Sequence, residues 1–297
     1  MAGKRERRRR GGCLPRLLWL TMLLAALAAF CIYENRSIQT TETEILSARL
    51  PEGFDGFRAV QLSDLHGAEF GRGNCRLLDA VRQAEPEAIF ITGDLVDRHT
   101  AQPERYAAEL GAALTAVAPT YYVTGNHEWS LGTAEVKRIK EALQQSGVTV
   151  LSNDFVTLSR GGAEIALAGV DDPNGYADQK TPEALAEELR QSRGDGFWLL
   201  LAHRNNRFRG GYCRLGADLT LSGHAHGGIW RLPFTDGLID TTMTLFPSYT
   251  SGLYCCDAGD CGGAQVYVSR GLGNSPRFAL RLLNRPEVSV LTFRRAA

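Results

Sequence analysis

Histidines gather in this sequence at the ends of short apolar runs. The chain has six histidines, and only His99 lies away from such a run. Carboxylate and amide side chains occupy equivalent places, as Asp64, Asp94 and Asn126 show. Imidazole, carboxylate and amide groups together are typical metal ligands, so the pattern indicates one metal site assembled from separate segments. The runs with their polar ends cover residues 59–66, 88–97, 121–128, 197–203 and 219–226.

The elements that position these groups follow from the alternation of two patterns. The apolar runs are short and β-prone, and stretches with apolar residues near helical spacing separate them. The predicted helices are residues 77–85, 104–117, 134–146 and 182–192. Alternating strands and helices up to about residue 150 predict a largely parallel sheet, whose ligand site lies at the carboxyl ends of the strands. Shorter strands with fewer helices follow, which predicts a second sheet packed on the first.

Seven side chains are candidate metal ligands. They are Asp64, His66, Asp94, Asn126, His203, His224 and His226. This number exceeds the needs of one four-coordinate zinc ion. It suits two divalent ions about 3.5–4 Å apart, and the mixed nitrogen and oxygen ligands favour Mn, Fe or Zn. Two such ions bind phosphoryl oxygens and activate water, so we expect hydrolysis of a phosphate ester.

Two further residues are predicted to take part in proton transfer. His127 directly follows the candidate ligand Asn126 and is free to act as a general acid on the leaving oxygen. Asp97, close to Asp94, is a plausible group to orient His127, and its position is also compatible with a cap on the turn after its strand. Among their neighbours, Arg98 is compatible with contact to a phosphate, but we expect a solvated surface residue. Glu128 is expected to be a structural carboxylate rather than a ligand.

The ordered blocks resemble those of the calcineurin-like metallophosphoesterase superfamily. All five blocks are present in order, and the likeness covers residues 57–235 directly. Two later stretches, 221–234 and 268–274, are similar to the membrane-anchored bacterial branch that contains YkuE-like and YaeI-like proteins. The blocks are Asp64-x-His66, Gly93-Asp94-x-x-Asp97, Gly125-Asn126-His127-Glu128, His203 and Gly223-His224-x-His226.

The resemblance implies a fold and a role for each site residue. The fold is an α/β, four-layer αββα sandwich of two mixed sheets flanked by helices. The implied ligands of one metal are Asp64, His66 and His226. Those of the other are Asn126, His203 and His224, with Asp94 bridging, His127 as proton donor and Asp97 orienting it. Many relatives have a proline after His203, where this chain has Arg204, so the shape of that loop is expected to differ.

The N-terminus predicts a membrane segment. The first 16 residues hold seven Lys or Arg and one acidic residue, and residues 17–33 carry no charge. At about 1.5 Å per residue this stretch spans roughly 25 Å, the short limit of a membrane helix. The basic flank is expected to stay cytoplasmic, which makes the rest extracytoplasmic. The segment is also compatible with a signal peptide that is cleaved, leaving a secreted protein, and with a buried core helix. The predicted parts are a basic cytoplasmic tail (1–16), a transmembrane signal anchor (17–33), a connector with one strand (34–56) and the metallophosphoesterase domain (57–297).

The charge and cysteine content of the chain limit the classes of binding partner and the pairings that we expect. Basic and acidic residues are equal in number, 33 each, but the basic N-terminus leaves the rest of the chain acidic overall. An acidic body does not neutralise phosphate backbones, so nucleic acid is not expected as a partner. Three of the seven cysteines, Cys255, Cys256 and Cys261, lie close enough in sequence to pair in an oxidising compartment.

The substrate is left open by the sequence. Apolar residues after the last ligands, among them Trp230, Leu232, Leu245 and Phe246, either close the core of the second sheet or receive an acyl chain beside the site. With a membrane anchor, an acyl-binding role suggests a phospholipid or a nucleotide-linked glycolipid such as UDP-2,3-diacylglucosamine, a substrate linked to related membrane-associated members of the superfamily. The motifs are equally compatible with a phosphodiesterase or phosphatase acting on soluble esters, and they allow a metal-binding scaffold without activity.

Overall fold

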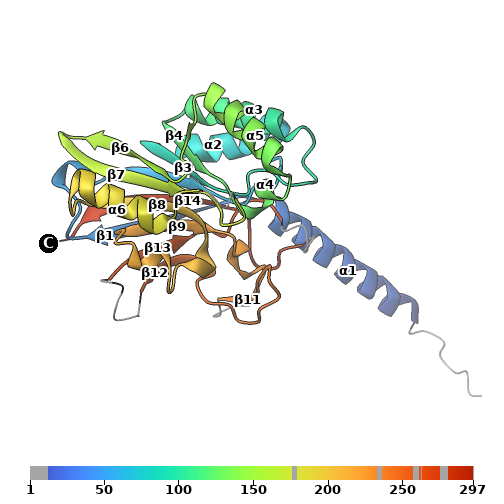
Figure 1. Ribbon diagram of the computed structural model, residues 1–297. Helices are drawn as coiled ribbons and strands as arrows, with labels where there is room; N and C mark the ends of the chain where they lie inside the picture. Colours follow the sequence, from blue (N-terminus) through green and yellow to red (C-terminus); the bar gives the residue numbers. More distant parts are fainter. Residues whose placement is uncertain are drawn as a thin grey trace, which may run out of the picture.

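A computed structural model describes residues 13–175, 179–232, 236–256, 261, 263–274 and 280–296. Two six-stranded sheets stack face to face, helices cover their outer faces, and one long helix projects from the end of the sandwich (Figure 1). The predicted four-layer αββα fold is therefore confirmed. Most of the basic tail, and Pro233 and Phe234 of the apolar loop, lie outside the described residues.

The helices form where apolar side chains recur at helical spacing. Helix α5, for example, buries Val136, Ile139 and Leu143 on one face. Helix α6 begins as its sequence predicts, because the Thr181 hydroxyl accepts a hydrogen bond from the amide of Ala184. The helices are α1 (Cys13–Arg36), α2 (Cys75–Gln83), α3 (Pro103–Thr115), the short α4 (Asn126–Trp129), α5 (Thr133–Gln145) and α6 (Pro182–Arg193).

The first sheet has the strand order β1-β14-β2-β3-β4-β5. Strands β2, β3, β4 and β5 are parallel, as the alternation of strands and helices predicts. Strand β14 lies antiparallel to β2 and parallel to β1, so the sheet is mixed. The strands are β1 (Gln39–Ser47), β2 (Arg58–Leu62), β3 (Ala88–Thr92), β4 (Thr120–Val123), β5 (Thr149–Val150) and β14 (Glu287–Arg295).

The second sheet has the order β12-β13-β9-β8-β7-β6. Its four central strands are parallel, and β12 and β6 are antiparallel at the two edges. A small hairpin of β10 (Trp230–Arg231) and β11 (Gly237–Ile239) stands outside both sheets. The strands are β6 (Asp154–Arg160), β7 (Ala163–Val170), β8 (Trp198–Arg204), β9 (Leu219–Gly223), β12 (Gly252–Cys255) and β13 (Gln265–Val268).

The hydrophobic core has three parts, which lie between the four layers of the fold. Strand β3 contributes side chains to two of these core layers. Ile89 and Ile91 point to the layer beneath α2, α3 and α5, whereas Phe90 points to the layer between the sheets. This alternation follows from the two-residue period of a strand. The third layer lies between the second sheet and α6, where Leu185 and Leu189 are buried. Because both sheets are covered on both faces, central strands such as β3, β8 and β9 are almost wholly buried.

Two details differ from the sequence prediction. The last strand, expected among those of the second sheet, is β14 and lies inside the first. The one strand predicted in the connector, over residues 43–50, is present as β1, but it begins earlier, at Gln39, and pairs along its length with β14. Both differences have one cause. Strand β14 pairs with β1 and β2, some 250 and 230 residues before it in the sequence. A local sequence pattern does not indicate pairing between strands so far apart.

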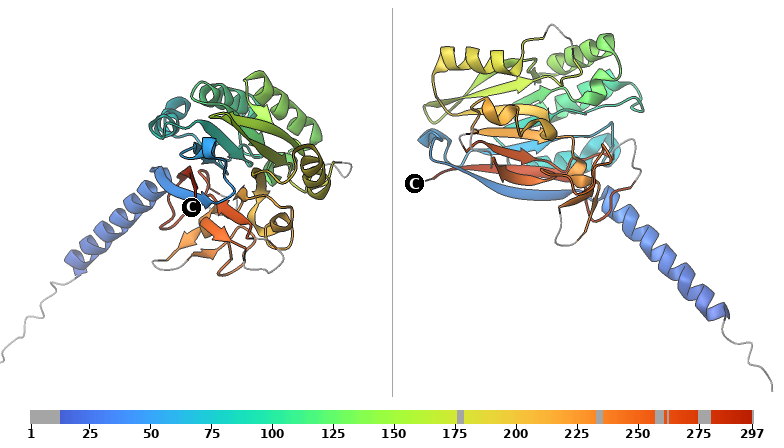
Figure 2. Two further views of the ribbon diagram at one scale, coloured as in Figure 1. Left: turned by 90° about the vertical axis from the view of Figure 1, so that its left-hand side faces the viewer. Right: turned by 60° about the horizontal axis from the view of Figure 1, so that its bottom comes forward.

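Helix α1 (Cys13–Arg36) contains the predicted membrane segment and is longer than it. Over Arg16–Arg36 it is long and apolar enough to cross a bilayer, and only 6% of its most apolar window is buried. Figures 1 and 2 show it leaving the sandwich as a single projecting rod. The buried-core interpretation of this segment is therefore excluded.

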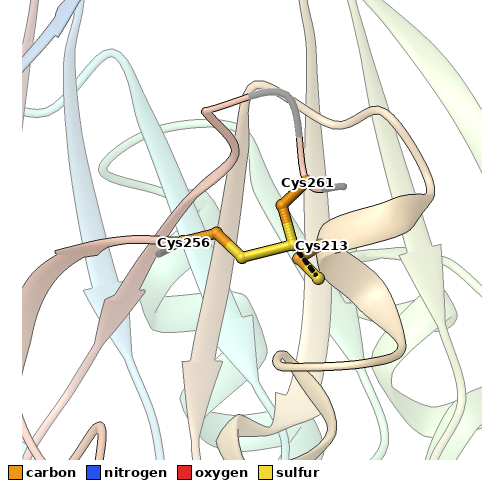
Figure 3. Close-up of a disulfide and its surroundings, with 3 residues drawn as sticks. All are labelled: Cys213, Cys256 and Cys261. Atoms are coloured by element: carbon orange, nitrogen blue, oxygen red, sulfur yellow. Dashed lines mark hydrogen bonds between the residues drawn. A yellow bond between two sulfur atoms is a disulfide. The ribbon is translucent and has the colours of Figure 1, made fainter. Parts of the chain in front are cut away.

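Two of the three cysteines that the sequence predicted to pair are joined in the structure. Cys256 and Cys261 form a disulfide, and Cys255 is exposed with a free thiol. The sequence prediction did not include Cys213, whose sulfur lies 2.6 Å from that of Cys261 (Figure 3). These sulfurs lie in the third core layer, apart from the histidine cluster.

Candidate metal centre

Five strands deliver the candidate ligands to one place. Strands β2, β3 and β4 of the first sheet, and β8 and β9 of the second, end at the same side of the sandwich. Five of the residues concerned have left-handed backbone, a conformation that costs energy in residues other than glycine and is tolerated at functional sites. Their φ angles are 52° at Asp64, 51° at His66, 52° at Asp94, 69° at His224 and 47° at His226.

One group of ligand atoms comes from Asp64, His66 and His226. The Nε2 atoms of the two histidines are 3.1 Å apart, and Nε2 of His226 is 3.4 Å from Oδ1 of Asp64. Their ligand atoms all lie within 4.8 Å of one another, and the three residues offer donor atoms to a single ion. The Asp64 carboxylate also accepts a hydrogen bond from the backbone amide of His224, which joins the β2 and β9 ends.

A second group comes from Asp94, His203 and His224. Oδ2 of Asp94 is 3.1 Å from Nε2 of His203, and that atom is 3.2 Å from Nδ1 of His224. Nδ1 of His203 lies 2.8 Å from the carbonyl oxygen of Thr92, which fixes the ring and leaves Nε2 for the site. Asp94 also lies between the groups, because its Oδ2 is 3.8 Å from Nε2 of His66.

The electrostatics of the cluster suit a cation. Burial alone would raise the pKa of Asp94, but the neighbouring imidazoles, above all His203, hold it well below its usual range. Burial alone would lower the pKa of His203, yet Asp94 raises it to about 10. Burial and the charge of His203 lower the pKa of His224 to about 3. Neutral His224 therefore has one nitrogen lone pair for a metal, beside an ionised carboxylate.

Atoms without a partner test whether the residues fit metal ions. Oδ1 of Asn126 and Nε2 of His224 are buried and have no hydrogen-bond partner. A buried acceptor without a partner is costly, and a metal ion at the cluster is a partner that an amide oxygen suits. Asn126 begins α4, directly beyond the end of β4, and lines the same cavity as Asp94 and His224.

His127 lies at the rim of this cluster. Its backbone amide donates to Oδ1 of Asp94 over 2.8 Å, and its ring stands edge-on to that of His66 with centroids 4.7 Å apart. Burial lowers the pKa of the His127 imidazole. The side chain lines the cavity described below, where it is free to meet a bound ester.

Asp97 has a different neighbour from the one expected. Its Oδ2 is 3.6 Å from Nδ1 of His66, and its Oδ1 accepts hydrogen bonds from the amide of His99 and the hydroxyl of Thr100. Asp97 therefore faces His66, a candidate metal ligand. The sequence analysis had predicted that Asp97 orients His127. His99 contributes only its backbone to Asp97, and its side chain is exposed.

Glu128 is a brace between two of the ligand loops. The fully buried carboxylate accepts hydrogen bonds from the amides of Asp94 and Gly125 through Oε2, and from those of Leu95 and Val96 through Oε1. The distances run from 2.6 to 3.4 Å. It holds Asp94 through the backbone and is not itself in either ligand group. The expectation of a structural carboxylate agrees with this, although four donors were not foreseen.

Sequence reasoning missed the residues behind His226. The fully buried Arg281 places Nη2 3.2 Å from Nδ1 of His226 and donates from Nη1 to the carbonyl of Arg270 over 2.7 Å. Asn284 donates to the carbonyls of His226 and Ile229. These residues come from the segment before β14, more than 50 residues after the last ligand, so no local motif marked them.

The cluster opens into a cavity of about 600 Å³. Two arginines, Arg98 and Arg204, line it beside the ligands, together with Thr241 and Thr242. Arg204 is held by two hydrogen bonds to Asp172, at 2.6 and 3.0 Å. Arg98 was expected to be a solvated surface residue. It is exposed, but it also faces the cavity, where an arginine suits a phosphate.

The chain is similar to known phosphoesterases along most of its length. A family model described as calcineurin-like phosphoesterase matches residues 57–228. "Uncharacterized metallophosphoesterase YkuE" of Bacillus subtilis is 34% identical over 268 residues, which cover 88% of this chain and 87% of that one. "Phosphodiesterase YaeI" of Escherichia coli is 29% identical, with 79% and 81% covered. "Transmembrane protein with metallophosphoesterase domain" of Danio rerio is 29% identical over 87% of this chain and 58% of its own length.

Proposed function

This chain belongs to the calcineurin-like phosphoesterase family and is a metal-dependent phosphoester hydrolase, and we propose that Asp94 bridges two divalent ions at the centre of its cavity. The observation that carries the proposal is the position of Asp94. Its Oδ2 lies 3.1 Å from His203 of one ligand group and 3.8 Å from His66 of the other. A carboxylate in that place links two sites that imidazoles complete.

The remaining ligands would divide between the ions. Asp64, His66 and His226 would hold one ion, and His203 and His224, joined by Asn126, would hold the other. Bound divalent ions of this kind lower the pKa of water and bind phosphoryl oxygens. The mixed imidazole, carboxylate and amide ligands favour Mn, Fe or Zn over Ca and Mg.

The other residues of the cavity bind and protonate the ester. His127 donates the proton that the leaving oxygen needs, because its ring is at the rim of the cluster and is not required as a ligand. Arg98 and Arg204 bind the non-reacting phosphate oxygens from the cavity wall. Asp97 orients His66 and so acts on a ligand instead of on the proton donor, in keeping with the 3.6 Å that separates its carboxylate from Nδ1 of His66.

Helix α1 anchors the chain in the membrane by a single span, with the catalytic domain on the extracytoplasmic side. Its length, composition and exposure support the span, and relatives named as transmembrane proteins agree with it. The seven basic residues of the first 16 support the orientation. The substrate that follows is a phosphoester or pyrophosphate in a membrane lipid or nucleotide-linked glycolipid, of which UDP-2,3-diacylglucosamine is one candidate.

A metal add-back experiment on the full chain tests the catalytic proposal. The protein, stripped by a chelator, is assayed on a chromogenic phosphodiester and a phosphomonoester after addition of Mn²⁺, Fe²⁺, Zn²⁺ or Mg²⁺. We expect turnover that depends on the metal and falls at least a thousandfold in Asp94→Asn. The matched control is Asp79→Asn, whose side chain is 61% exposed on α2 and pairs only with Arg82 among the described contacts. Full activity of Asp94→Asn would refute the bridging role.

A competition between substrates tests the lipid proposal separately. The same preparation in vesicles is given a soluble phosphodiester and UDP-2,3-diacylglucosamine in turn. Higher kcat/KM for the lipid-linked ester supports the proposal. Equal values, with no effect of the vesicle, would leave a general phosphoesterase acting on soluble esters. Binding of metal without turnover on any ester would favour a metal-binding scaffold.

A further inference from the structure

The domain has one concentration of exposed apolar side chains. Among the described residues outside α1, seven of the eight large apolar residues that are well exposed come from two segments, 230–246 and 280–283. The exception is Leu46, on β1. We call these seven the apolar surface. They are Trp230, Leu232, Met243, Leu245, Phe246, Leu280 and Leu283, with exposed fractions from 40% for Trp230 to 68% for Phe246.

Backbone hydrogen bonds make the apolar surface one ordered structure. The Arg231 amide donates to the carbonyl of Leu282 over 2.9 Å, and the Trp230 indole donates to the carbonyl of Leu280 over 3.1 Å. On the other side, the Phe246 amide donates to the carbonyl of Leu238, in strand β11 of the hairpin, over 3.0 Å. Exposed apolar groups that are held in place in this way mark a surface that something covers.

The end of α1 is fastened to the same structure. The Arg281 amide donates to Oδ1 of Asn35 over 2.8 Å, and Nδ2 of Asn35 donates to the carbonyl of Arg281 over 3.0 Å. Arg285 donates to the carbonyls of Ser37 and Ile38 and lies over the ring of Tyr33. The segment that carries Leu280 and Leu283 therefore touches the point where the apolar helix leaves the domain.

Helix α1 and the apolar surface also lie on the same side of the domain. Helix α1 and the loop around β11 leave the domain on the same side in Figure 1, and the right-hand view of Figure 2 agrees. Leu46 is at the opposite end of β1, seven residues beyond Gln39, which is roughly 23 Å along a strand. The apolar surface thus adjoins the helix that spans a bilayer, and the other exposed apolar residue does not.

From these observations we infer that the apolar surface inserts into the lipid leaflet from which α1 emerges. The inference rests on the proposed single membrane span. Apolar and aromatic side chains beside a membrane helix bury themselves at the boundary between headgroups and acyl chains. Trp230 is suited to that depth, because its ring is apolar and its N–H already has a partner in Leu280.

The inserted surface would place the metal cavity at the membrane. Thr241 and Thr242 line the cavity, and Thr241 donates to the carbonyl of His224 over 3.4 Å. The next residue, Met243, is 54% exposed and belongs to the apolar surface. The cavity wall and the apolar surface therefore meet at consecutive residues, Thr242 and Met243, a short path for a phosphate group that is still attached to its acyl chains.

Depth-dependent quenching of tryptophan tests the inference in the full chain. The protein is reconstituted into vesicles of phosphatidylcholine and phosphatidylglycerol, with spin-labelled lipids as the quencher inside the bilayer and iodide as the quencher in water. The Trp230 signal is the difference between the full chain and Trp230→Phe. Trp19 of α1, which is retained throughout, reports whether the chain remains anchored.

We expect lipid labelled near the headgroup to reduce the Trp230 signal at least twofold, with little quenching by iodide. The double substitution of Leu245→Asp with Phe246→Asp removes most of that quenching, whereas the equally exposed control Leu46→Asp leaves it unchanged. Phe246→Ser is a milder second variant. Because soluble-ester hydrolysis is measured on the same vesicles, loss of catalysis and loss of insertion are told apart.

Two results would overturn the inference. Free access of iodide to Trp230, while Trp19 is still quenched by lipid, would show that the surface faces water. Protection of Trp230 from both quenchers would show that a protein, such as a second copy of this chain, covers the surface in place of the leaflet.

Discussion

Glu128 offers the sharpest test of how the metal ligands are held. In Glu128→Gln one carboxylate oxygen becomes an NH₂ group, so two of the four backbone amides that Glu128 now accepts lose their acceptor. Burial and Asp94 raise the pKa of Glu128 to about 7, but a protonated carboxyl still has two oxygens that accept, whereas the amide has one. Each buried donor without a partner costs about 1–3 kcal/mol. We therefore expect a loss of about 3 kcal/mol in the free energy of unfolding.

Urea unfolding of the metal-free full chain in detergent measures this loss. Trp129, next to Glu128 and only 7% exposed, reports the transition by its fluorescence. With a slope of about 3 kcal/mol/M, the midpoint falls by about 1 M. The control Glu141→Gln removes an exposed charge that pairs with Lys137 at 3.8 Å and costs less than about 0.5 kcal/mol. Equal midpoints for the two variants would refute the brace.

Three further perturbations have defined outcomes. Because Asp94 raises the pKa of His203 to about 10, protons compete with metal for this histidine at neutral pH. Metal affinity should therefore rise with pH, and metal binding should release protons. Titration calorimetry in buffers of different ionisation enthalpy measures both effects, and a pH-independent affinity would contradict the prediction. Arg281→Met leaves buried carbonyls without a donor and removes the guanidinium beside His226. We expect urea unfolding to show a loss of about 3 kcal/mol in the free energy of unfolding, and metal binding to be at least tenfold weaker. Unchanged metal affinity would contradict the positioning role of Arg281. Reduction of the Cys256–Cys261 disulfide, with a sequence separation of 5, should lower stability by about 2 kcal/mol, and an unchanged melting curve would exclude it.

The candidate ligands were predictable because each lies at or just beyond the carboxyl end of an apolar strand, where a short motif reveals both the strand and its polar end. Asp64, Asp94 and His203 are found in this way, and parallel order brings their strand ends together. The layer structure was predictable for the same reason, since alternation of strands and helices is a local signal.

What could not be predicted depends on long-range pairing. Glu128 was recognised as structural, but its four donors come from loops that meet only in the folded sandwich. Arg281 contacts His226 across 55 positions of sequence, and β14 enters the first sheet after every other strand of the domain. Asp97 shows a related difficulty. Its motif identifies it as a site residue, but only the turn after β3 decides that it faces His66.

The exposure of the apolar loop also had to come from the structure. Of the residues that the sequence left open, Ile229 is buried in the domain, whereas Trp230, Leu232, Leu245 and Phe246 are exposed. A run of apolar residues is compatible with a core strand or with a membrane-facing loop, because composition does not say which neighbours cover it.

The central claim, a pair of metal ions joined by Asp94, is tested most directly by metal binding itself. The full chain, stripped and then titrated with Mn²⁺, is measured by electron paramagnetic resonance together with metal analysis of the equilibrated protein. We predict two ions per chain and the broadened spectrum of exchange-coupled manganese, with coupling lost in Asp94→Asn and kept in Asp79→Asn. One ion per chain, or two ions with the separate six-line spectra of isolated manganese, would contradict the claim.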